Sequence, residues 1–236
     1  MRLLADMGVF GGAFDFVVDE RRLILEKTWQ HLELSLAAIA IAAVIALPIG
    51  VWLGHVHRGS FVAVNVANIG RALPSLVLIA IGITFLGVGF ANVTVALVVL
   101  AVPPILTNAY VAVDAVEEES VEAARGMGMT PWQVLRKVEV PLALPLIFAG
   151  VRTATVFVVA TATIAAIAGG GGLGDIIVNQ AGYGIEGVVG AAIVVSVLAL
   201  AADFLLGLLQ RLLTPAGLRV KAPAFEPDVV TNTTPR

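Results

Sequence analysis

Five long runs of apolar residues dominate this chain, and they restrict it to folds that cross a membrane. They cover residues 32–54, 61–88, 93–113, 142–168 and 188–212. Each run reaches the ~20 residues that an α-helix needs to span the hydrocarbon core of a bilayer. Only 13% of the residues are charged, well below the share that is usual in soluble domains. The sequence therefore predicts an all-α polytopic membrane protein with about five transmembrane helices, a sixth being left open.

The segments outside the runs are expected to lie at or beyond the membrane surface. Residues 7–18 are mostly apolar but too short to span, and residues 19–27 are rich in charge. The segment lacks a basic start followed by a small-residue cleavage site, so we do not expect a cleaved signal peptide. We therefore expect an interfacial segment at residues 1–30, one transmembrane domain at 31–213, and a proline-rich cytoplasmic tail at 214–236 that is flexible at its end.

Lys and Arg are concentrated in alternate connections between the runs. They occur in the turn that holds Arg58, in the connection at residues 117–141 and in the C-terminal tail, whereas the turn at Gly87 and the connection at 169–187 carry none. Cytoplasmic loops carry an excess of Lys and Arg. We therefore place the first group of segments in the cytoplasm and the second group outside, in a multi-pass protein of the cell membrane.

Three charged residues lie well away from the ends of the predicted spans. Arg71, Arg152 and Asp203 would each cost ~2.5–3.5 kcal/mol at mid-membrane on insertion scales, so each needs a partner or a function. They can pair with one another between helices, or they can line a polar path or an inner gate.

The fourth run contains threonines at helical spacing. Residues eight apart fall near one face of a helix, which groups Thr153 with Thr161 and Thr155 with Thr163. This polar stripe fits close helix packing through Thr hydroxyls, and it fits the lining of a pore equally well.

The sequence offers no residues for catalysis and no metal site. It contains no Cys, and His55 and His57 have no third ligand nearby, so we interpret them as part of a solvated interfacial turn. The patterns G-x-x-x-x-G-K-[ST], G-x-S-x-G and H-E-x-x-H are absent. Gly169, Gly171 and Gly174 match G-x-G-x-x-G, but a dinucleotide site needs a strand before this motif. We expect a non-catalytic protein without a cofactor of its own, and the net charge of −3 is too small to indicate a nucleic-acid partner.

A polar interruption at residues 122–145 separates the third run from the fourth, and its pattern predicts two short helices. Gly128 can end the first helix, because Gly accepts a positive φ without steric cost. In the second helix, Thr130 can cap the N-terminus, Pro131 suits the first helical position, and Gln133 completes a capping box with Thr130.

The same interruption carries a spaced set of residues: Glu122, Ala123, Ala124, Gly128, Val138, Val140 and Pro141. This set resembles the EAA loop of the permease subunits of ABC importers, whose pattern is EAA, three residues, Gly, nine residues and Ile-x-Leu-Pro. Val138 replaces Ile and Val140 replaces Leu, and both keep a branched apolar side chain. The resemblance implies that residues 117–141 form a cytoplasmic coupling loop, which docks into a groove on a separate ATP-hydrolysing subunit.

Three further segments carry a more specific resemblance: residues 150–175, the pair Pro74 and Ser75, and residues 104–110. They are similar to the permeases of osmoprotectant importers, which translocate glycine betaine, carnitine, choline and similar solutes. The resemblance implies the type I ABC importer permease fold, in which two identical or related permease chains enclose a path. It implies that the path or gate includes Pro74, Ser75, Asn108, Tyr110, Arg152, Thr161 and Thr163.

The resemblance also implies partners. ATP would be bound by ATPase subunits, and an extracytoplasmic substrate-binding protein would deliver the solute. Quaternary ammonium solutes are often held in aromatic cages, but the plausible aromatic residues here, Phe85, Phe90, Tyr110 and Phe157, make a poor cage. We therefore expect selectivity to reside in the binding protein. Two alternatives stay open: a permease for methionine or another small solute, because methionine-importer permeases share the run GGGGLGD, and a secondary transporter that needs no ATPase.

Overall fold

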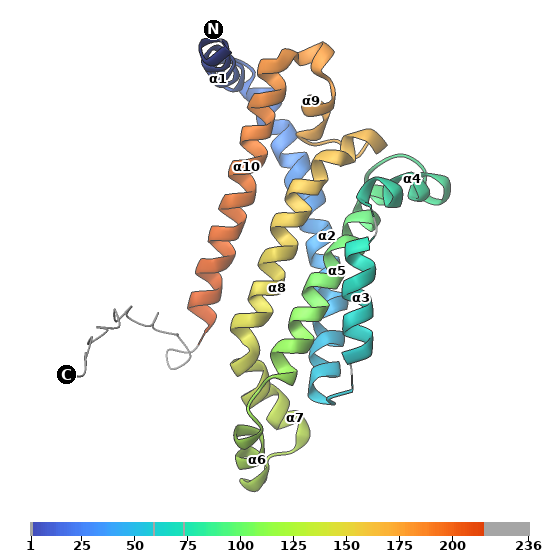
Figure 1. The fold of residues 1–236 in the computed structure, drawn as a ribbon, viewed down its shortest axis with the longest axis vertical. Coiled ribbons are helices and arrows are strands. Elements are labelled where there is room, and N and C mark those ends of the chain that lie inside the picture. The colour runs from blue at the N-terminus through green and yellow to red at the C-terminus, as the bar shows by residue number, and fades with distance from the viewer. Residues whose placement is uncertain (1, 59, 73, 215–236) are drawn as a thin grey trace, which may run out of the picture.

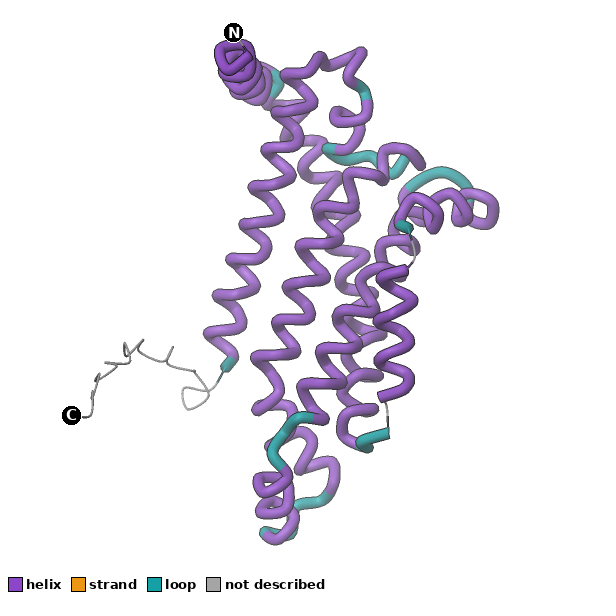
Figure 2. Tube along the Cα trace, viewed as in Figure 1, coloured by secondary structure: helices purple, strands orange, loops and turns teal. Residues whose placement is uncertain are grey.

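The computed structural model describes residues 2–58, 60–72 and 74–214, and all regular secondary structure in these ranges is helical (Figures 1 and 2). In chain order the elements are α1 (Arg2–Asp19), α2 (Arg21–His55), α3 (Ser60–Ala72), α4 (Ser75–Leu86), α5 (Phe90–Asp114), α6 (Glu118–Gly126), α7 (Pro131–Val134), a π-helical turn (Leu135–Glu139), α8 (Val140–Thr161), a 3₁₀ helix (Ala162–Ala168), α9 (Gly174–Val178) and α10 (Gln180–Leu213). Residues 215–236 of the predicted tail lie outside the described residues.

Four helices in the described ranges are long and apolar enough to cross a membrane. They are α2, α5, α10 and a continuous helix from Pro131 to Ala168, which joins α7, the π-helical turn, α8 and the 3₁₀ helix without a loop. Four of the five predicted spans lie within these helices, so the all-α membrane class is confirmed. The fourth span differs in one respect, because its helix begins at Pro131 rather than at residue 142.

The second predicted span, residues 61–88, is wrong as a single helix. It is divided into α3 and α4, which have 13 and 12 residues. A helix of this length is only about 20 Å long, against ~30 Å for the hydrocarbon core. Pro74 is extended, with φ −65° and ψ 127°, and proline both lacks an N–H and disfavours helical backbone in the preceding residue. As a result α3 lies along α5, whereas α4 turns across the end of the bundle (Figure 1).

The N-terminal segment consists of two helices that meet at Glu20. Helix α1 lies across one end of the bundle and packs on α10 (Figure 1). Helix α2 begins at Arg21 and runs through the charged residues into the first apolar run. The first span is therefore part of a longer helix than the hydropathy alone predicts.

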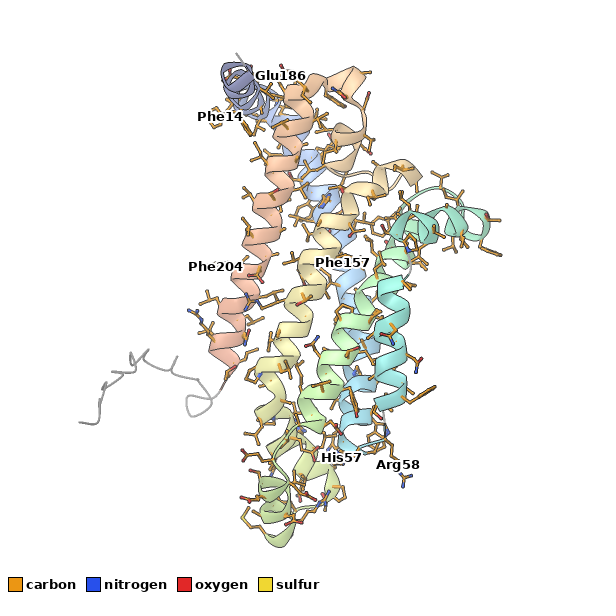
Figure 3. All side chains as sticks on the ribbon, viewed as in Figure 1. Phe14, His57, Arg58, Phe157, Glu186 and Phe204 are labelled. Carbon is orange, nitrogen blue, oxygen red and sulfur yellow. The ribbon has the colours of Figure 1, made fainter. Side chains whose placement is uncertain are left out.

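The two ends of the bundle carry different connections, in the grouping that the distribution of Lys and Arg predicts. His57, Arg58, α6 and α7 lie at one end, which we call the α6–α7 end (Figures 1 and 3). Helices α1, α4 and α9 lie at the other, together with Glu186, and we call this the α9 end (Figures 1 and 3).

The packing of α2 against α5 holds the centre of the bundle together. Every fourth residue on this face of α2 is small and buried: Ala38, Ala42, Ala46, Gly50 and Gly54. A Cβ at Gly50 would lie 2.7 Å from the carbonyl oxygen of Leu106, and a Cβ at Gly54 would lie 2.8 Å from that of Tyr110. Small residues let the backbones of membrane helices approach closely, so van der Waals contact can stabilise the pair.

We expect Gly54→Val to destabilise the bundle, because the new side chain would collide with backbone atoms of α5. Overpacking of this kind typically costs about 1–3 kcal/mol. The measurement is the thermal unfolding midpoint of the purified protein in detergent. Gly11→Val in α1 is the matched control, since nothing lies within 4 Å of a Cβ at that position. Equal losses of stability in the two variants would contradict the role given to the α2–α5 contact.

Candidate functional site

The coupling loop, residues 117–141, projects from the bundle as a compact pair of helices (Figure 1). Helix α6 ends at Gly126, and Gly128 has φ +83°, a conformation that glycine adopts without strain. At the start of α7, the backbone N of Gln133 donates to Thr130 Oγ1 at 3.4 Å, and the backbone N of Thr130 donates to Gln133 Oε1 at 2.9 Å. The two predicted helices and the predicted capping box are confirmed.

The seven predicted coupling residues divide into an inner set and an outer set. The inner set is at least partly buried in the loop or at the start of α8, and the outer set is exposed; the inner residues are Ala124, Val138, Val140 and Pro141, and the outer residues are Glu122, Ala123 and Gly128. Ala124 packs with Val121 and Val134 in a small apolar cluster. The inner set therefore stabilises the loop, and the outer set is available to contact another molecule.

Two large apolar side chains are exposed on the same loop. Met127 is 72% exposed and Trp132 is 64% exposed, on either side of Gly128 in the sequence. Exposed apolar and aromatic side chains on an otherwise polar surface mark protein–protein contacts. They were not among the predicted coupling residues, although Met127 precedes Gly128 and Trp132 stands between Pro131 and Gln133 of the predicted second helix.

The two histidines after the first span are paired with carboxylates. His55 Nδ1 lies 2.6 Å from Glu139 Oε2, and His57 Nδ1 lies 2.8 Å from Asp114 Oδ1. The side chain of His55 is only 10% exposed, so the predicted solvated turn is wrong for this residue. The reason is tertiary: folding brings the end of α2 against a residue 84 positions further along the chain, which no local pattern indicates.

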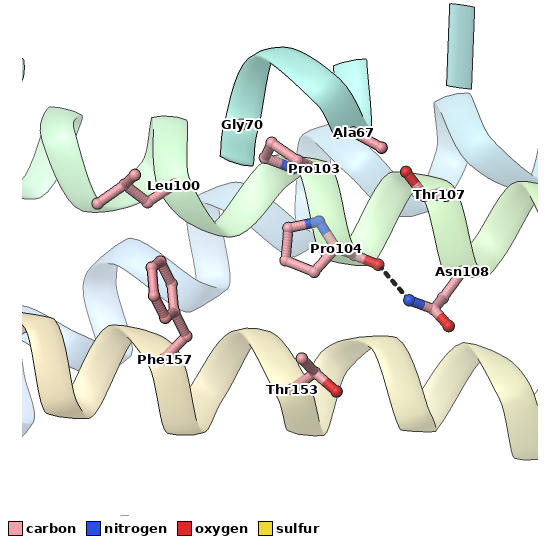
Figure 4. Close-up of a pocket in the computed structure, with 9 residues that line it drawn as sticks. All are labelled: Ala67, Gly70, Leu100, Pro103, Pro104, Thr107, Asn108, Thr153 and Phe157. Atoms are coloured by element: carbon pink, nitrogen blue, oxygen red, sulfur yellow. Dashed lines mark hydrogen bonds between the residues drawn. The ribbon is translucent and has the colours of Figure 1, made fainter. Parts of the chain in front are cut away.

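A cavity of about 500 Å³ opens between α3, α5 and α8 (Figure 4). It is lined by Ala67, Gly70, Leu100, Pro103, Pro104, Thr107, Asn108, Thr153 and Phe157. Thr107, Asn108 and Thr153 supply polar groups and Phe157 supplies an aromatic ring, and none of these described lining residues is charged. Asn108 Nδ2 donates to the carbonyl oxygen of Pro104 at 2.8 Å (Figure 4). The cavity suits a small solute that is bound by contact, hydrogen bonds and an aromatic face rather than by an ion pair.

Of the seven predicted path or gate residues, Asn108 alone lines this cavity. Tyr110 is buried, and its hydroxyl donates to Asp114 Oδ2 at 3.2 Å near the α6–α7 end. Pro74 and Ser75 lie at the start of α4, outside the cavity. The structure therefore does not gather the predicted residues into one site.

The predicted threonine stripe of the fourth span is not continuous. The α-helix ends at Thr161 and a 3₁₀ helix follows, so the period of 3.6 residues no longer applies at Thr163. Thr155 and Thr161 are buried between helices, and Thr163 Oγ1 donates to the carbonyl oxygen of Ala160 at 2.8 Å. Thr153 is the one member of the stripe that lines the cavity, one helical turn before Phe157.

Arg152 and Asp203 form an ion pair between α8 and α10. Arg152 Nε donates to Oδ1 at 2.9 Å and Nη2 donates to Oδ2 at 2.7 Å, while Nη1 donates to Gln210 Oε1 at 3.4 Å. Two parallel hydrogen bonds are the strong form of an Arg–carboxylate contact. The sequence left open whether these charges pair between helices or line a polar path or gate, and pairing between helices is observed for Arg152 and Asp203. The side chain of Arg71 lies outside the described part of the chain.

At the α9 end, the glycine-rich loop (residues 169–174) is attached to the start of α2. The backbone N of Gly172 donates to Gln30 Oε1 at 3.2 Å, and Lys27 Nζ lies 2.6 Å from Asp175 Oδ2. Gly172 has φ +85°, and a Cβ there would lie 3.2 Å from the backbone of α2, so this position needs glycine for both conformation and space. The sequence prediction gave no role to Lys27 or Gln30, because their partners are more than a hundred residues away in the chain.

We expect Arg152→Leu alone to destabilise the protein, because it leaves the carboxylate of Asp203 without its cation. An unpaired charge at mid-membrane costs about 2.5–3.5 kcal/mol on insertion scales. The double variant Arg152→Leu with Asp203→Leu should recover most of the loss in the thermal unfolding midpoint. A double variant no more stable than the single one would show that the ion pair does not account for the effect.

The chain is similar in sequence to known transport proteins. The family model described as "Binding-protein-dependent transport system inner membrane component" matches residues 46–215. The chain is 41% identical over 197 residues to the glycine betaine/carnitine/choline transport system permease protein OpuCB of Bacillus subtilis (strain 168), covering 83% of this chain and 91% of that protein. It is 40% identical over 197 residues to the carnitine transport permease protein OpuCB of Listeria monocytogenes, covering 83% of this chain and 90% of that protein.

Structural comparison gives a similar arrangement of helices. A chain from an inward-facing structure of the MetNI methionine ABC transporter matches with a TM-score of 0.73 and 26% identity, covering 84% of this chain and 99% of that chain. A chain from an amino acid ABC transporter with histidines matches with a TM-score of 0.65 and 22% identity, covering 83% of this chain and 96% of that chain. The second match supports the fold alone.

Proposed function

We propose that this chain, which belongs to the family of binding-protein-dependent transport system inner membrane components, translocates osmoprotectants such as glycine betaine, choline or carnitine. Its fold is that of a type I ABC importer permease, and it is a multi-pass transport component rather than an enzyme.

The coupling loop is the observation that carries the proposal for the driving partner. Glu122, Ala123 and Gly128 face outward on a helical pair that its own apolar cluster stabilises, and Met127 and Trp132 add exposed apolar surface. Such a surface fits a groove on an ATPase subunit. ATP would be bound there, since this chain lacks the sequence G-x-x-x-x-G-K-[ST].

In the proposed cycle, two permease chains, identical or related, enclose the path, and each coupling loop sits on an ATPase subunit in the cytoplasm. ATP binding draws the ATPase subunits and the two loops together and opens the path to the outside, and hydrolysis resets it. A ligand drives such a switch only through its different affinity for the two states. The loaded substrate-binding protein would act at the α9 end, on the outer side.

The cavity between α3, α5 and α8 suits a solute that carries a quaternary ammonium group. Such cations are attracted to aromatic faces, and Phe157 presents its ring in the cavity (Figure 4). Asn108 Nδ2 has a second hydrogen that can donate to the carboxylate of such a solute. The hydroxyls of Thr107 and Thr153 donate to backbone carbonyl oxygens, so their own oxygens can accept from a solute hydroxyl. Because no described lining residue is charged, binding would be weak enough for release, and the binding protein would supply selectivity.

A permease for methionine or another small solute is the second candidate, and the match to the MetNI methionine ABC transporter favours it. The relatives named for glycine betaine, carnitine and choline are more similar in sequence, at 40% identity or above. A mild-detergent pull-down of the tagged chain, followed by uptake into vesicles that contain the recovered complex, tests both candidates. We expect a co-purifying ATPase subunit and ATP-dependent uptake of glycine betaine, choline or carnitine but not of methionine. Uptake that needs no ATP would indicate a secondary transporter instead.

Gly128→Asp should leave the chain in the membrane but abolish the recovery of the ATPase subunit, because it adds a charge and a side chain to the docking face. We expect ATP-dependent uptake to fall roughly tenfold or more, as when an unpaired charge is buried at an interface. Gly87→Asp is the matched control, since Gly87 also has a positive φ and open surroundings but lies at the other end of the bundle. Normal recovery of the ATPase subunit with Gly128→Asp would count against the docking role.

Phe157→Ala should raise the apparent KM for quaternary ammonium solutes, while Phe157→Tyr, which keeps the ring, should not. Loss of one cation–π contact predicts an increase of about 2- to 30-fold. The measurement is the initial rate of uptake against solute concentration at saturating binding protein. Phe204→Ala, which removes an exposed ring of α10 outside the cavity (Figure 3), is the control. The same increase in both variants would show that the cavity does not bind the solute.

A further inference from the structure

Glu139 is the one buried acidic residue in the described ranges. It is 1% exposed and completes the π-helical turn that connects α7 to α8. Its Oε2 contacts His55 Nδ1 at 2.6 Å, while its Oε1 has no hydrogen-bond partner. Burying a carboxylate is costly unless it is paired. Glu139 therefore depends on His55, and it has that partner only while the coupling loop stays against α2.

His55 attaches this contact to the best-packed part of the bundle. It is the last residue of α2 and follows Gly54 directly, and Gly54 is one of the two glycines that bring α2 close to the backbone of α5. The imidazole ring also lies 6.1 Å from the ring of Trp52, measured between centroids. A force on Glu139 therefore reaches α2 and α5 together.

The coupling loop is joined to the bundle by the chain at both of its ends and by contacts with its neighbours. At one end it follows α5 after two residues. It continues into α8 through the π-helical turn without a break, and π-helical turns are frequent at functional sites. Among the described residues, His55–Glu139 is the only hydrogen-bonded contact between α2 and the loop. The other contacts are apolar, in a cluster that includes Leu135, Val51 and Val140. Apolar surfaces are not directional and can slide, whereas a short hydrogen bond depends on distance and angle.

We propose that the His55–Glu139 pair is a positioning contact that makes α2 and α5 move with α8 when the coupling loop is displaced. The inference rests on the coupling role proposed above. Without the pair, a displaced loop would still tilt α8, but α2 and α5 would follow incompletely. The cavity between α3, α5 and α8 would then change shape less for each ATP that is hydrolysed.

Glu139→Leu tests this role, because it removes the polar contact and the buried carboxylate at the same time. It leaves His55 Nδ1 without its partner, which lowers the stability of the protein. The double variant His55→Leu with Glu139→Leu removes both partners, a change that is often neutral for stability, so this complex should still assemble and show the same effect. In vesicles that contain the complex with its ATPase subunit, we expect normal ATP hydrolysis but roughly tenfold less solute transported per ATP hydrolysed. Glu139→Gln keeps an oxygen that can accept from the imidazole, and it should retain that ratio within about twofold.

His57→Leu is the matched control, since it removes the second histidine–carboxylate pair at the same end, whose acidic partner Asp114 lies on α5. An unchanged ratio of transport to hydrolysis in Glu139→Leu would overturn the inference, as would an equal fall in His57→Leu. Failure of both Glu139→Leu and the double variant to assemble would also overturn it, because the pair would then serve the fold alone. A wild-type complex without any ATP-dependent uptake would overturn the proposed function, and the inference with it.

Discussion

The close approach of α2 and α5 is the contact on which the rest of this bundle depends. Lipid is as apolar as the side chains it surrounds, so helices in a membrane associate through packing and polar contacts rather than through hydrophobic burial. Gly50 and Gly54 make this packing possible, and α5 in turn contacts α3, α4 and α8. The same packing fixes where the end of α2 lies, and so it decides that His55 meets Glu139.

Features that depend on local chemistry could be predicted from the sequence. Four spans were predicted because a spanning helix must satisfy its own backbone hydrogen bonds and be apolar over its whole length, and both properties belong to one continuous segment. The capping box of Thr130 and Gln133 needs residues only three positions apart. The second span was the exception. Proline can remain inside a membrane helix if neighbouring groups satisfy the freed backbone, and whether they do so at Pro74 is a tertiary property.

The polar contacts that define the candidate site depend on distant residues, and this part could not be predicted. Asn108 was predicted to lie on the path, Thr153 was placed in a stripe that could line a pore, and Phe157 was named as a plausible aromatic contact. Their meeting with Thr107 in one cavity was not predicted. Arg71, Arg152 and Asp203 were noted as charges that can pair with one another, and the fold shows that Arg152 pairs with Asp203, 51 residues away. For His55, the neighbouring His57 suggested a solvated turn, whereas the carboxylate that determines its environment comes from the coupling loop. In each case the residue type indicated that the side chain needs a polar or charged partner, and only the fold shows which residue that partner is.

The unbroken course of helix from Pro131 to Ala168 also has a mechanical consequence. At ~1.5 Å per residue, the 22 residues of α8 within it form a rod about 33 Å long. One end of the rod begins in the coupling loop, and the other leads through the 3₁₀ helix to the glycine-rich loop. If the rod turned by about 10° around its centre, its two ends would move by about 3 Å in opposite directions. A single tilt of this helix would therefore displace both of its ends, one on each side of the membrane. The inner and outer faces of the permease would then change together, because the same helix reaches both.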